Sequence, residues 1–190
     1  MTAKLFHNES KTLVVKIDKN DSRLKAVKFL ASAMNLKDLR FHITHFKVEN
    51  NQAVSTDGGR LHVANNIPLE DGFYIVHKNT KAMVLIEKAY DLDTNEGGFP
   101  DTAEYIKLPE KEYFGAAVDF NLKNLSSIYT QIIRAMPGKN TLNVDFVRDV
   151  CNCFDAIGTF IIPEPRKGEI EDAVHFISGD LHAVVMPMRT

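Results

Sequence analysis

The sequence predicts an α+β fold in which helices pack on one face of antiparallel sheets. Two stretches carry apolar residues at helical spacing, and each follows a strand candidate and precedes several short alternating or apolar runs. The order strand, helix, strands therefore occurs twice, although no residue-level repeat is visible. A chain of 190 residues is also long enough to bury a substantial core.

The first unit opens with a strand candidate at 12–17. A helix is expected over 23–34, with Asp21 or Ser22 as its cap, because short side-chain oxygens accept from the free amides of a first turn. Its apolar face consists of Leu24, Val27, Leu30, Ala31 and Met34. Sheet-forming runs follow at 39–48, 52–55, 60–64, 73–76 and 82–86. The last two could form a hairpin, although 82–86 could instead be helical.

A polar segment at 91–109 separates the two units. It contains Gly97-Gly98, Pro100 and Pro109, which are typical of a long loop or connector. The predicted division is a first half at 1–98, a connector at 99–111 and a second half at 112–190, the two halves together forming one domain.

The second unit repeats the order. A strand is expected at 116–120, followed by a helix over 122–136 that Asn121 caps and Pro137-Gly138 ends. Its apolar stripe consists of Leu125, Ile128, Tyr129, Ile132 and Met136. Further strands are predicted at 142–146, 159–162, 173–177 and 181–186, with Ser178-Gly179-Asp180 as a hairpin turn.

The composition is that of an ordinary globular protein, with 44% apolar and 25% charged residues. The net charge of −2 shows no overall basic excess, so any contact with nucleic acid would need cations gathered on one surface. Cys151 and Cys153 lie too close together to staple a secreted scaffold. With no apolar leader or membrane-length run, a cytoplasmic protein is expected.

No catalytic, metal or cofactor site is predicted. His42 and His45 lie on a predicted strand and would face opposite sides, so they would not bind one metal ion together. Cys151 and Cys153 lack two further ligands at zinc-site spacing, and buried packing is the favoured interpretation. No nucleophile motif is recognisable, which disfavours an enzyme.

Three segments, taken together, resemble the bacterial DNA polymerase III β sliding clamp family. The first contains Thr56-Asp57-Gly58-Gly59-Arg60-Leu61, the second contains Phe99-Pro100-Asp101 followed by Leu108-Pro109, and the third is Val184-Val185-Met186-Pro187-Met188-Arg189. They are similar to a domain's Thr-Asp-Gly-His-Arg-Leu motif, to the connector between clamp domains, and to the clamp's C-terminal end. Phe120-Asn121 also resembles the start of the clamp's last helix.

The resemblance implies a DNA-clamp-like fold assembled from parts of two clamp domains. The first half is similar to the start of the middle domain, and the second half to the end of the last domain. The chain is much shorter than a three-domain clamp chain. Gly59 stands where the family has His, and Thr190 stands where Leu is usual. Ring closure by two copies is therefore not expected, and assembly into a homo-oligomer is left open.

In the family, the matched segments form a hydrophobic groove that binds short linear peptides of DNA polymerases and other clamp-binding proteins. Flexible Met side chains suit such a groove because they adapt to different apolar anchors. The alternative is that Val184–Met188 is an edge strand that completes a core. The groove residues implied by the resemblance are Thr56, Gly58, Arg60, Leu61, Pro109, Val184, Met186, Pro187 and Met188.

The family's helices also contact double-stranded DNA through phosphates, without sequence preference. The corresponding cations here are Arg23, Lys25 and Lys28 on the first helix, and Lys123 and Arg134 on the second. Solvated surface cations explain the same pattern equally well. The sequence thus leaves open a clamp-like replication accessory factor, a DNA-free peptide-binding module or regulator of a full clamp, and, without positive support, an enzyme of unknown type.

Overall fold

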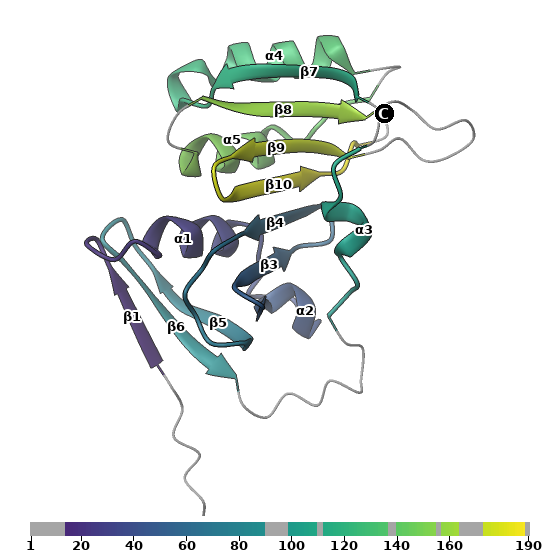
Figure 1. Cartoon of the computed structure of the whole chain (residues 1–190). Helices are drawn as coiled ribbons and strands as arrows, with labels where there is room; N and C mark the ends of the chain where they lie inside the picture. The colour runs from purple at the N-terminus through teal and green to yellow at the C-terminus, as the bar shows by residue number, and fades with distance from the viewer. Residues whose placement is uncertain are drawn as a thin grey trace, which may run out of the picture.

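A single ten-stranded antiparallel sheet runs through the protein (Figure 1). The computed structural model describes residues 14–89, 99–109, 112–136, 140–154, 157–163 and 173–188. The strand order is β1-β6-β5-β2-β3-β4-β10-β9-β8-β7, so the strands before and after the predicted connector form two contiguous blocks of one sheet. The predicted α+β class is confirmed, whereas the division into halves at the connector stays a prediction.

The first block contains six strands. They are β1 (Val14–Asp18), β2 (His45–Glu49), β3 (Gln52–Thr56), β4 (Arg60–Ala64), β5 (Gly72–Asn79) and β6 (Met83–Ala89). The hairpin of β5 and β6 lies between β1 and β2 in the sheet. The run at 82–86 is therefore a strand, and the helical alternative is excluded.

The second block contains four strands. They are β7 (Glu112–Asp119), β8 (Ile157–Pro163), β9 (Val174–Ser178) and β10 (Leu181–Val185). In this block the first strand, β7, pairs directly with β8, whereas in the first block the β5–β6 hairpin lies between β1 and β2. The predicted turn between β9 and β10 is confirmed, and Gly179 occupies its left-handed position at φ 57°.

Helices α1 (Leu24–Ser32), α4 (Leu125–Ala135) and α5 (Val144–Cys153) cover one face of the sheet (Figure 1). A 3₁₀ turn, η1 (Leu122–Asn124), precedes α4, and the side chain of Asn121 caps it by accepting from the Lys123 amide at 3.0 Å. The capping prediction for α1 is wrong, because neither Asp21 nor Ser22 caps the helix. Arg23 occupies the N-cap position without a side-chain cap, and Asp21 instead accepts from the Arg23 amide before the helix begins.

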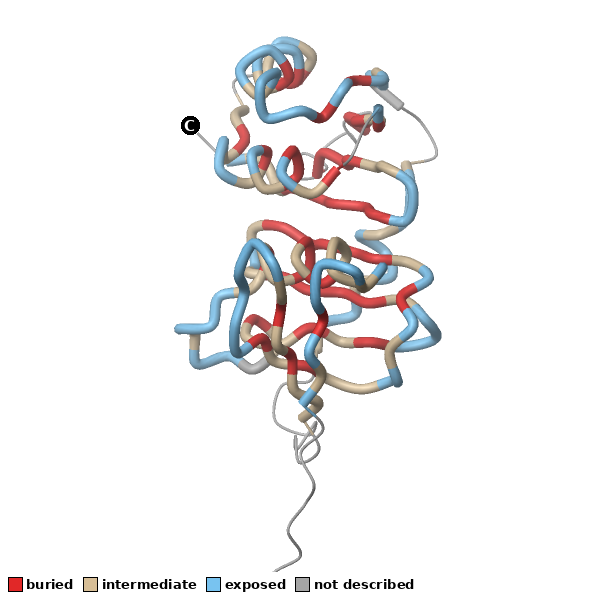
Figure 2. The backbone as a smooth tube through the Cα atoms, turned by 90° about the vertical axis from the view of Figure 1, so that its left-hand side faces the viewer, coloured by how far each residue is buried: buried red, intermediate tan, exposed pale blue. Residues whose placement is uncertain are grey.

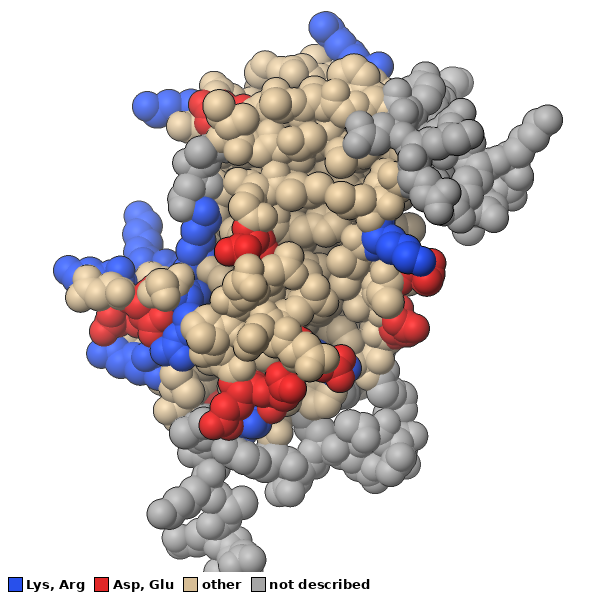
Figure 3. Space-filling view, viewed as in Figure 1, with Lys and Arg blue, Asp and Glu red and all other residues tan. Residues whose placement is uncertain are grey.

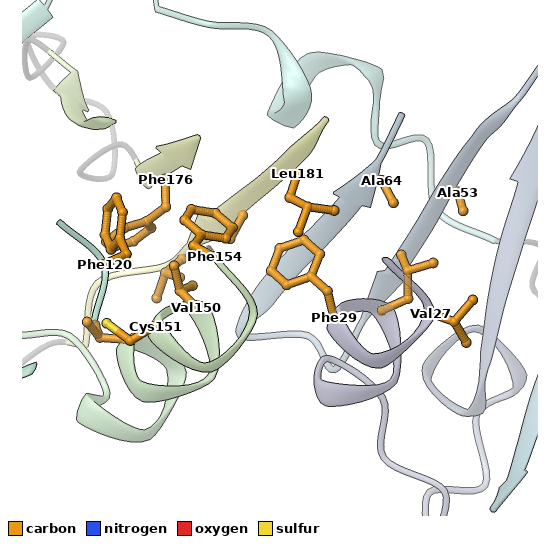
Figure 4. Close-up of a cluster of buried hydrophobic side chains, with 14 of the residues drawn as sticks. Val27, Phe29, Ala53, Ala64, Phe120, Val150, Cys151, Phe154, Phe176 and Leu181 are labelled. Atoms are coloured by element: carbon orange, nitrogen blue, oxygen red, sulfur yellow. The ribbon is translucent and has the colours of Figure 1, made fainter. Parts of the chain in front are cut away.

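One core runs beneath α1 and α5, which lie side by side across the junction of the two blocks (Figure 4). The rings of Phe29 on α1 and Phe154 after α5 are 5.6 Å apart. Buried segments continue through both blocks and the strands where they meet (Figure 2). The two blocks therefore share one hydrophobic core.

The strand predicted at 142–146 is wrong, because 144–153 forms α5. The alternation of Leu142, Val144 and Phe146 straddles the helix start, where the Asn143 side chain accepts from the Asp145 amide at 2.9 Å. The buried side chains beyond the cap are Val147, Val150, Cys151 and Phe154, at helical spacing. The expected burial of Cys151 is confirmed, and Cys153 is half-buried.

Two shorter stretches also differ from prediction. Within 39–48, a single helical turn, α2 (Phe41–Thr44), precedes β2, so His42 and His45 do not share a strand. Within the predicted connector, α3 (Ala103–Ile106) forms a helical turn on the sheet face opposite α1 and α5. Such single turns are too short to leave a periodic apolar pattern in the sequence.

Candidate functional site

The two blocks join where β4 pairs with β10, and the pairing is locally symmetric. The β4–β10 ladder is centred on the pair His62–Ala183. A local two-fold axis through this centre relates the pair Ala53–Ala64 of the β3–β4 hairpin to the pair Val174–Val185 of the β9–β10 hairpin. Because successive side chains alternate between faces, Ala64 and Val185 point towards the helices. The outward positions form a separate apolar cluster, which we call the outer cluster: Val54, Leu61, Val63, Ala173 and Val184.

The segment at 99–106 covers part of the outer cluster. Phe99, which precedes α3, and Ile106, the last residue of α3, pack against the cluster. Asp101 starts the helical turn by accepting from the Ala103 amide at 3.0 Å. Tyr105 stays 58% exposed, so its ring is available to a ligand at the edge of the cluster.

A groove of about 180 Å³ lies between this segment and the β4–β10 junction. It brings together several residues predicted for the peptide site: Thr56, Gly58, Arg60, Leu61, Val184 and Met186. Pro109, Pro187 and Met188 lie outside its lining, and their role in the site stays a prediction. The remaining lining comes from Pro100, Asp101, Thr102 and Tyr105, which sequence reasoning did not assign. The Phe99-Pro100-Asp101 match pointed to this segment, but only Pro109 was carried over from it.

The turn between β3 and β4 forms a rigid wall of the groove. The Thr56 hydroxyl donates to the Arg60 carbonyl at 2.7 Å and accepts from the Gly58 amide at 3.1 Å. Asp57 Oδ1 accepts from the amides of Gly59 and Arg60 at 3.0 and 3.2 Å. Gly58 has φ +90°, a conformation that glycine adopts at little cost.

Arg60 fixes this wall to the helices on the other face. Its Nε lies 2.9 Å from Asp57 and its Nη1 lies 2.6 Å from Asp149 on α5. The guanidinium also donates to the Ser32 carbonyl of α1 and stacks 4.2 Å from the Phe146 ring centroid. Since these contacts occupy the guanidinium, Arg60 offers the groove its backbone and stem more than a free charge.

Phe146 also explains the glycine that departs from the clamp motif. A Cβ on Gly59 would lie 3.1 Å from the Phe146 ring, closer than side chains normally approach. The glycine therefore lets α5 pack closely on the turn. This packing is specific to the combination of Gly59 with Phe146.

The C-terminal wall is held through its backbone. The Met186 amide donates to the Gly59 carbonyl at 3.0 Å, and Met188 and Thr141 exchange backbone bonds at 2.7 and 3.4 Å. Pro187 between them has no amide donor, which is consistent with the end of β10 at Val185. The half-buried Met186 side chain packs on the outer cluster, and Met188 is 44% exposed.

A second, more polar hollow of about 510 Å³ lies on the other side of the same segment. It shares Pro100, Asp101 and Thr102 with the groove, so Asp101 stands between the two. Its far wall includes Lys47 and Glu49, which form an ion pair at 2.9 Å. The exposed side chain of Asp101 therefore separates the groove from this hollow.

No protein-family model and no curated protein matches the sequence. Solved structures do. The DNA polymerase III subunit beta of Pseudomonas aeruginosa matches with a TM-score of 0.55 and 17% identity, over 93% of this chain and 66% of that chain. The DNA polymerase III subunit beta of Borrelia burgdorferi matches with a TM-score of 0.58 and 12% identity, over 98% of this chain and 67% of that chain.

The DNA polymerase sliding clamp of Bacillus subtilis agrees, with a TM-score of 0.57 and 12% identity, over 95% of this chain and 65% of that chain. The chain has the sliding-clamp fold. The match spans about two thirds of each clamp chain, and identities this low establish the fold alone.

Two buried histidines lie on the outward face of this clamp fold. His175 Nδ1 lies 2.9 Å from His182 Nε2, so one imidazole donates and the other accepts. Burial lowers the pKa of both side chains to about 4, and in His175 the neighbouring His182 adds to the effect. At neutral pH the pair is uncharged, and the visible surface over β8–β10 carries few charged side chains (Figure 3).

The predicted DNA-contacting cations differ in their surroundings. Arg23 is held by Asp21 at 2.6 and 2.9 Å, and this hydrogen bonding keeps the pKa of that carboxyl below its usual range. Lys28 Nζ donates to the Lys81 carbonyl at 2.7 Å, and Lys25 is half-buried on α1. Lys123 and Arg134 are exposed beside and on α4. The structure thus does not gather these cations on one helix surface.

Other sites are not found in the part of the chain that the structure describes. It holds no group of three His, Cys, Asp or Glu side chains that could bind a metal ion. Among the same residues, none of the helices combines the length and apolar character needed to cross a membrane.

Proposed function

We propose that this protein is a sliding-clamp-like DNA replication accessory protein that captures short linear peptides of partner proteins, without catalytic activity of its own. The observation that carries the proposal is the groove at the β4–β10 junction, where segments far apart in the sequence meet. Solved structures of the same fold are named as DNA polymerase sliding clamps, which supports replication as the setting.

The groove suits an apolar anchor. Leu61 and Val184 form its floor, Met186 forms an adaptable wall, and Tyr105 is free to stack on an incoming side chain. Its floor is already formed by packed strands, so binding requires little reorganisation. A short peptide with apolar or aromatic residues is therefore the ligand that fits best.

Truncating the groove should weaken peptide binding without unfolding the protein. A fluorescein-labelled peptide from the clamp-binding segment of a bacterial replicative polymerase is titrated and followed by anisotropy. We expect Met186→Ala and Tyr105→Ala each to raise the Kd about tenfold, the effect of losing about 1.4 kcal/mol at an anchor contact. Met83→Ala, a similarly half-buried Met on β6 outside the groove, is the matched control.

Three results would count against the groove. They are no binding at high micromolar protein, equal losses in Met186→Ala and Met83→Ala, and retention of full affinity by both groove variants. Circular dichroism of each variant separates a lost contact from a lost fold.

A second candidate is a DNA-free peptide-binding module that regulates or competes with a full clamp. It is favoured by the pairing of Arg23 with Asp21 and by the net charge of −2. Peptide binding by a protein that does not retain double-stranded DNA at low salt would select this alternative.

A further inference from the structure

The hairpin inserted between β1 and β2 brings lysines together on one surface. Lys16 on β1 and Lys78 on β5 both pair with Leu85 on β6, from opposite sides. Residues directly opposite in neighbouring strands point to the same face, so Lys16 and Lys78 flank Leu85 on the outward side. Both lysines are exposed.

The end of this hairpin adds three more lysines. Asp18 pairs with Met83, which sets the turn carrying Lys19 beside the turn carrying Lys81. Lys28 reaches the same place from α1, since its Nζ donates to the Lys81 carbonyl at 2.7 Å. We call this group the hairpin-tip cluster, and its members are Lys16, Lys19, Lys28, Lys78 and Lys81.

The lysines of the hairpin-tip cluster outnumber the acidic side chains near them. These are Asp18, Asp21, which is paired with Arg23, and Glu87, which lies against His77 on the same face of β6 as Leu85. Among the described residues, no ion pair joins Lys16, Lys19, Lys78 or Lys81 to a carboxylate. A chain whose net charge is −2 thus concentrates positive charge at one end. Figure 3 shows several Lys and Arg side chains on the left of the molecule, with Asp or Glu side chains among them.

The described part of the second block has no similar group of lysines. No hairpin separates β7 from β8, and the exposed cations associated with α4 are Lys123 and Arg134, near its two ends. Among the described residues, the inserted hairpin and the adjoining part of α1 therefore carry a dense group of lysines.

We infer that the hairpin-tip cluster binds the phosphate backbone of double-stranded nucleic acid without reading its sequence. The inference rests on the proposed function, because that function places the chain at DNA. Lysines act as compact, mobile point charges, which suits phosphates spaced along a duplex. The cluster is bordered by exposed polar residues, Asn20, Asn79 and Thr80, whereas insertion into a membrane surface needs apolar side chains beside the cations.

The test measures the salt dependence of duplex binding by anisotropy, using two short fluorescein-labelled duplexes of unrelated sequence. The full chain is compared with Lys78→Gln/Lys81→Gln and with the control Lys37→Gln/Lys107→Gln, which removes two exposed lysines outside the cluster. We expect equal affinity for both duplexes. In the hairpin variant the slope of log K against log[salt] should become shallower by about 1.8, as the loss of two phosphate contacts requires. The control should keep the parent slope.

Equal slopes in the parent and the hairpin variant, or an equal loss in the control, would overturn the inference. So would binding of the parent to phosphatidylserine vesicles but not to either duplex. The labelled peptide is titrated into the same samples. Retained peptide binding together with absent duplex binding would reject the hairpin-tip cluster alone, whereas absent peptide binding with hairpin-dependent duplex binding would reject the groove alone.

Discussion

Arg60 connects the groove wall to α1 and α5 through a set of contacts that no other cation can reproduce. Its planar guanidinium pairs with two carboxylates, donates to the Ser32 carbonyl and lies over the Phe146 ring. Lysine keeps the charge but loses the fork of donors and the stacking surface. The clamp motif suggested Arg60 for ligand contact, but its guanidinium mainly holds the β3–β4 turn against α1 and α5.

Replacing Arg60 with Lys should therefore destabilise the fold. We expect Arg60→Lys to lower the free energy of unfolding by about 2–3 kcal/mol, because buried donors and acceptors are left unmatched. Arg148→Lys, at an exposed ion pair with Asp145, should change it by less than about 0.5 kcal/mol. Urea denaturation of both variants measures their free energies of unfolding. Equally small losses in the two variants would show that the Arg60 contacts contribute little to stability.

The buried histidines predict how stability depends on pH. Burial lowers the pKa of His62 to about 3, and those of His175 and His182 to about 4. The unfolded chain binds protons at these side chains near pH 6.5, roughly the ordinary value, while the folded protein does not. Between about pH 6.5 and pH 4, protons therefore bind to the unfolded chain in preference to the folded protein. The free energy of unfolding is highest above pH ~6.5 and falls as the pH is lowered towards about 4.

Urea denaturation at pH 7 and pH 5 measures this loss. We expect a lower free energy of unfolding at pH 5, and a smaller difference between the two pH values in His182→Gln. An unfolding free energy that is the same at both pH values would contradict neutral, buried histidines.

At the scale of elements, α5 shows where sequence patterns fail. Leu142, Val144 and Phe146 alternate as in a strand, yet Val144 is 39% exposed and the alternation has no structural meaning. Asn143 decides the outcome, since its side chain satisfies the Asp145 amide and starts the helix. The α4 helix and the β9–β10 turn were predictable because an Asn cap, a clean apolar stripe and a turn glycine agree there.

The cap of α5 can be tested directly. Asn143→Ala should lower the free energy of unfolding by about 1 kcal/mol, because the Asp145 amide loses its acceptor. Asn152→Ala, at an exposed position near the end of the same helix, is the matched control and should have little or no cost. Equal effects of the two substitutions in thermal or urea denaturation would mean that the cap does not position α5.

Much of the groove was predictable, but not its full lining. The β3–β4 and C-terminal segments carry recognisable residues and meet through the β4–β10 ladder. The contribution of 100–105 depends on a single helical turn folding back over Val54 and Val184. That arrangement follows from tertiary packing, which local patterns do not encode.

For the whole molecule, the junction of two blocks is the feature that unites fold and proposed function. One sheet crosses the junction, one core lies beneath it on the helical side, and the groove lies on the outward side. The fold match spans about two thirds of a clamp chain. Because both walls belong to the same rigid sheet, a ligand in the groove meets a preformed surface.

The most direct test of this proposal follows the methionine methyl groups by NMR as the clamp-binding peptide is added. With methyl-labelled methionine, the Met186 signal should shift and saturate with the Kd measured by anisotropy, since its side chain lines the groove. The Met83 signal, on β6 outside the groove, should not move. An unchanged Met186 signal at saturating peptide, or shifts confined to Met83, would contradict a peptide-binding groove at the β4–β10 junction.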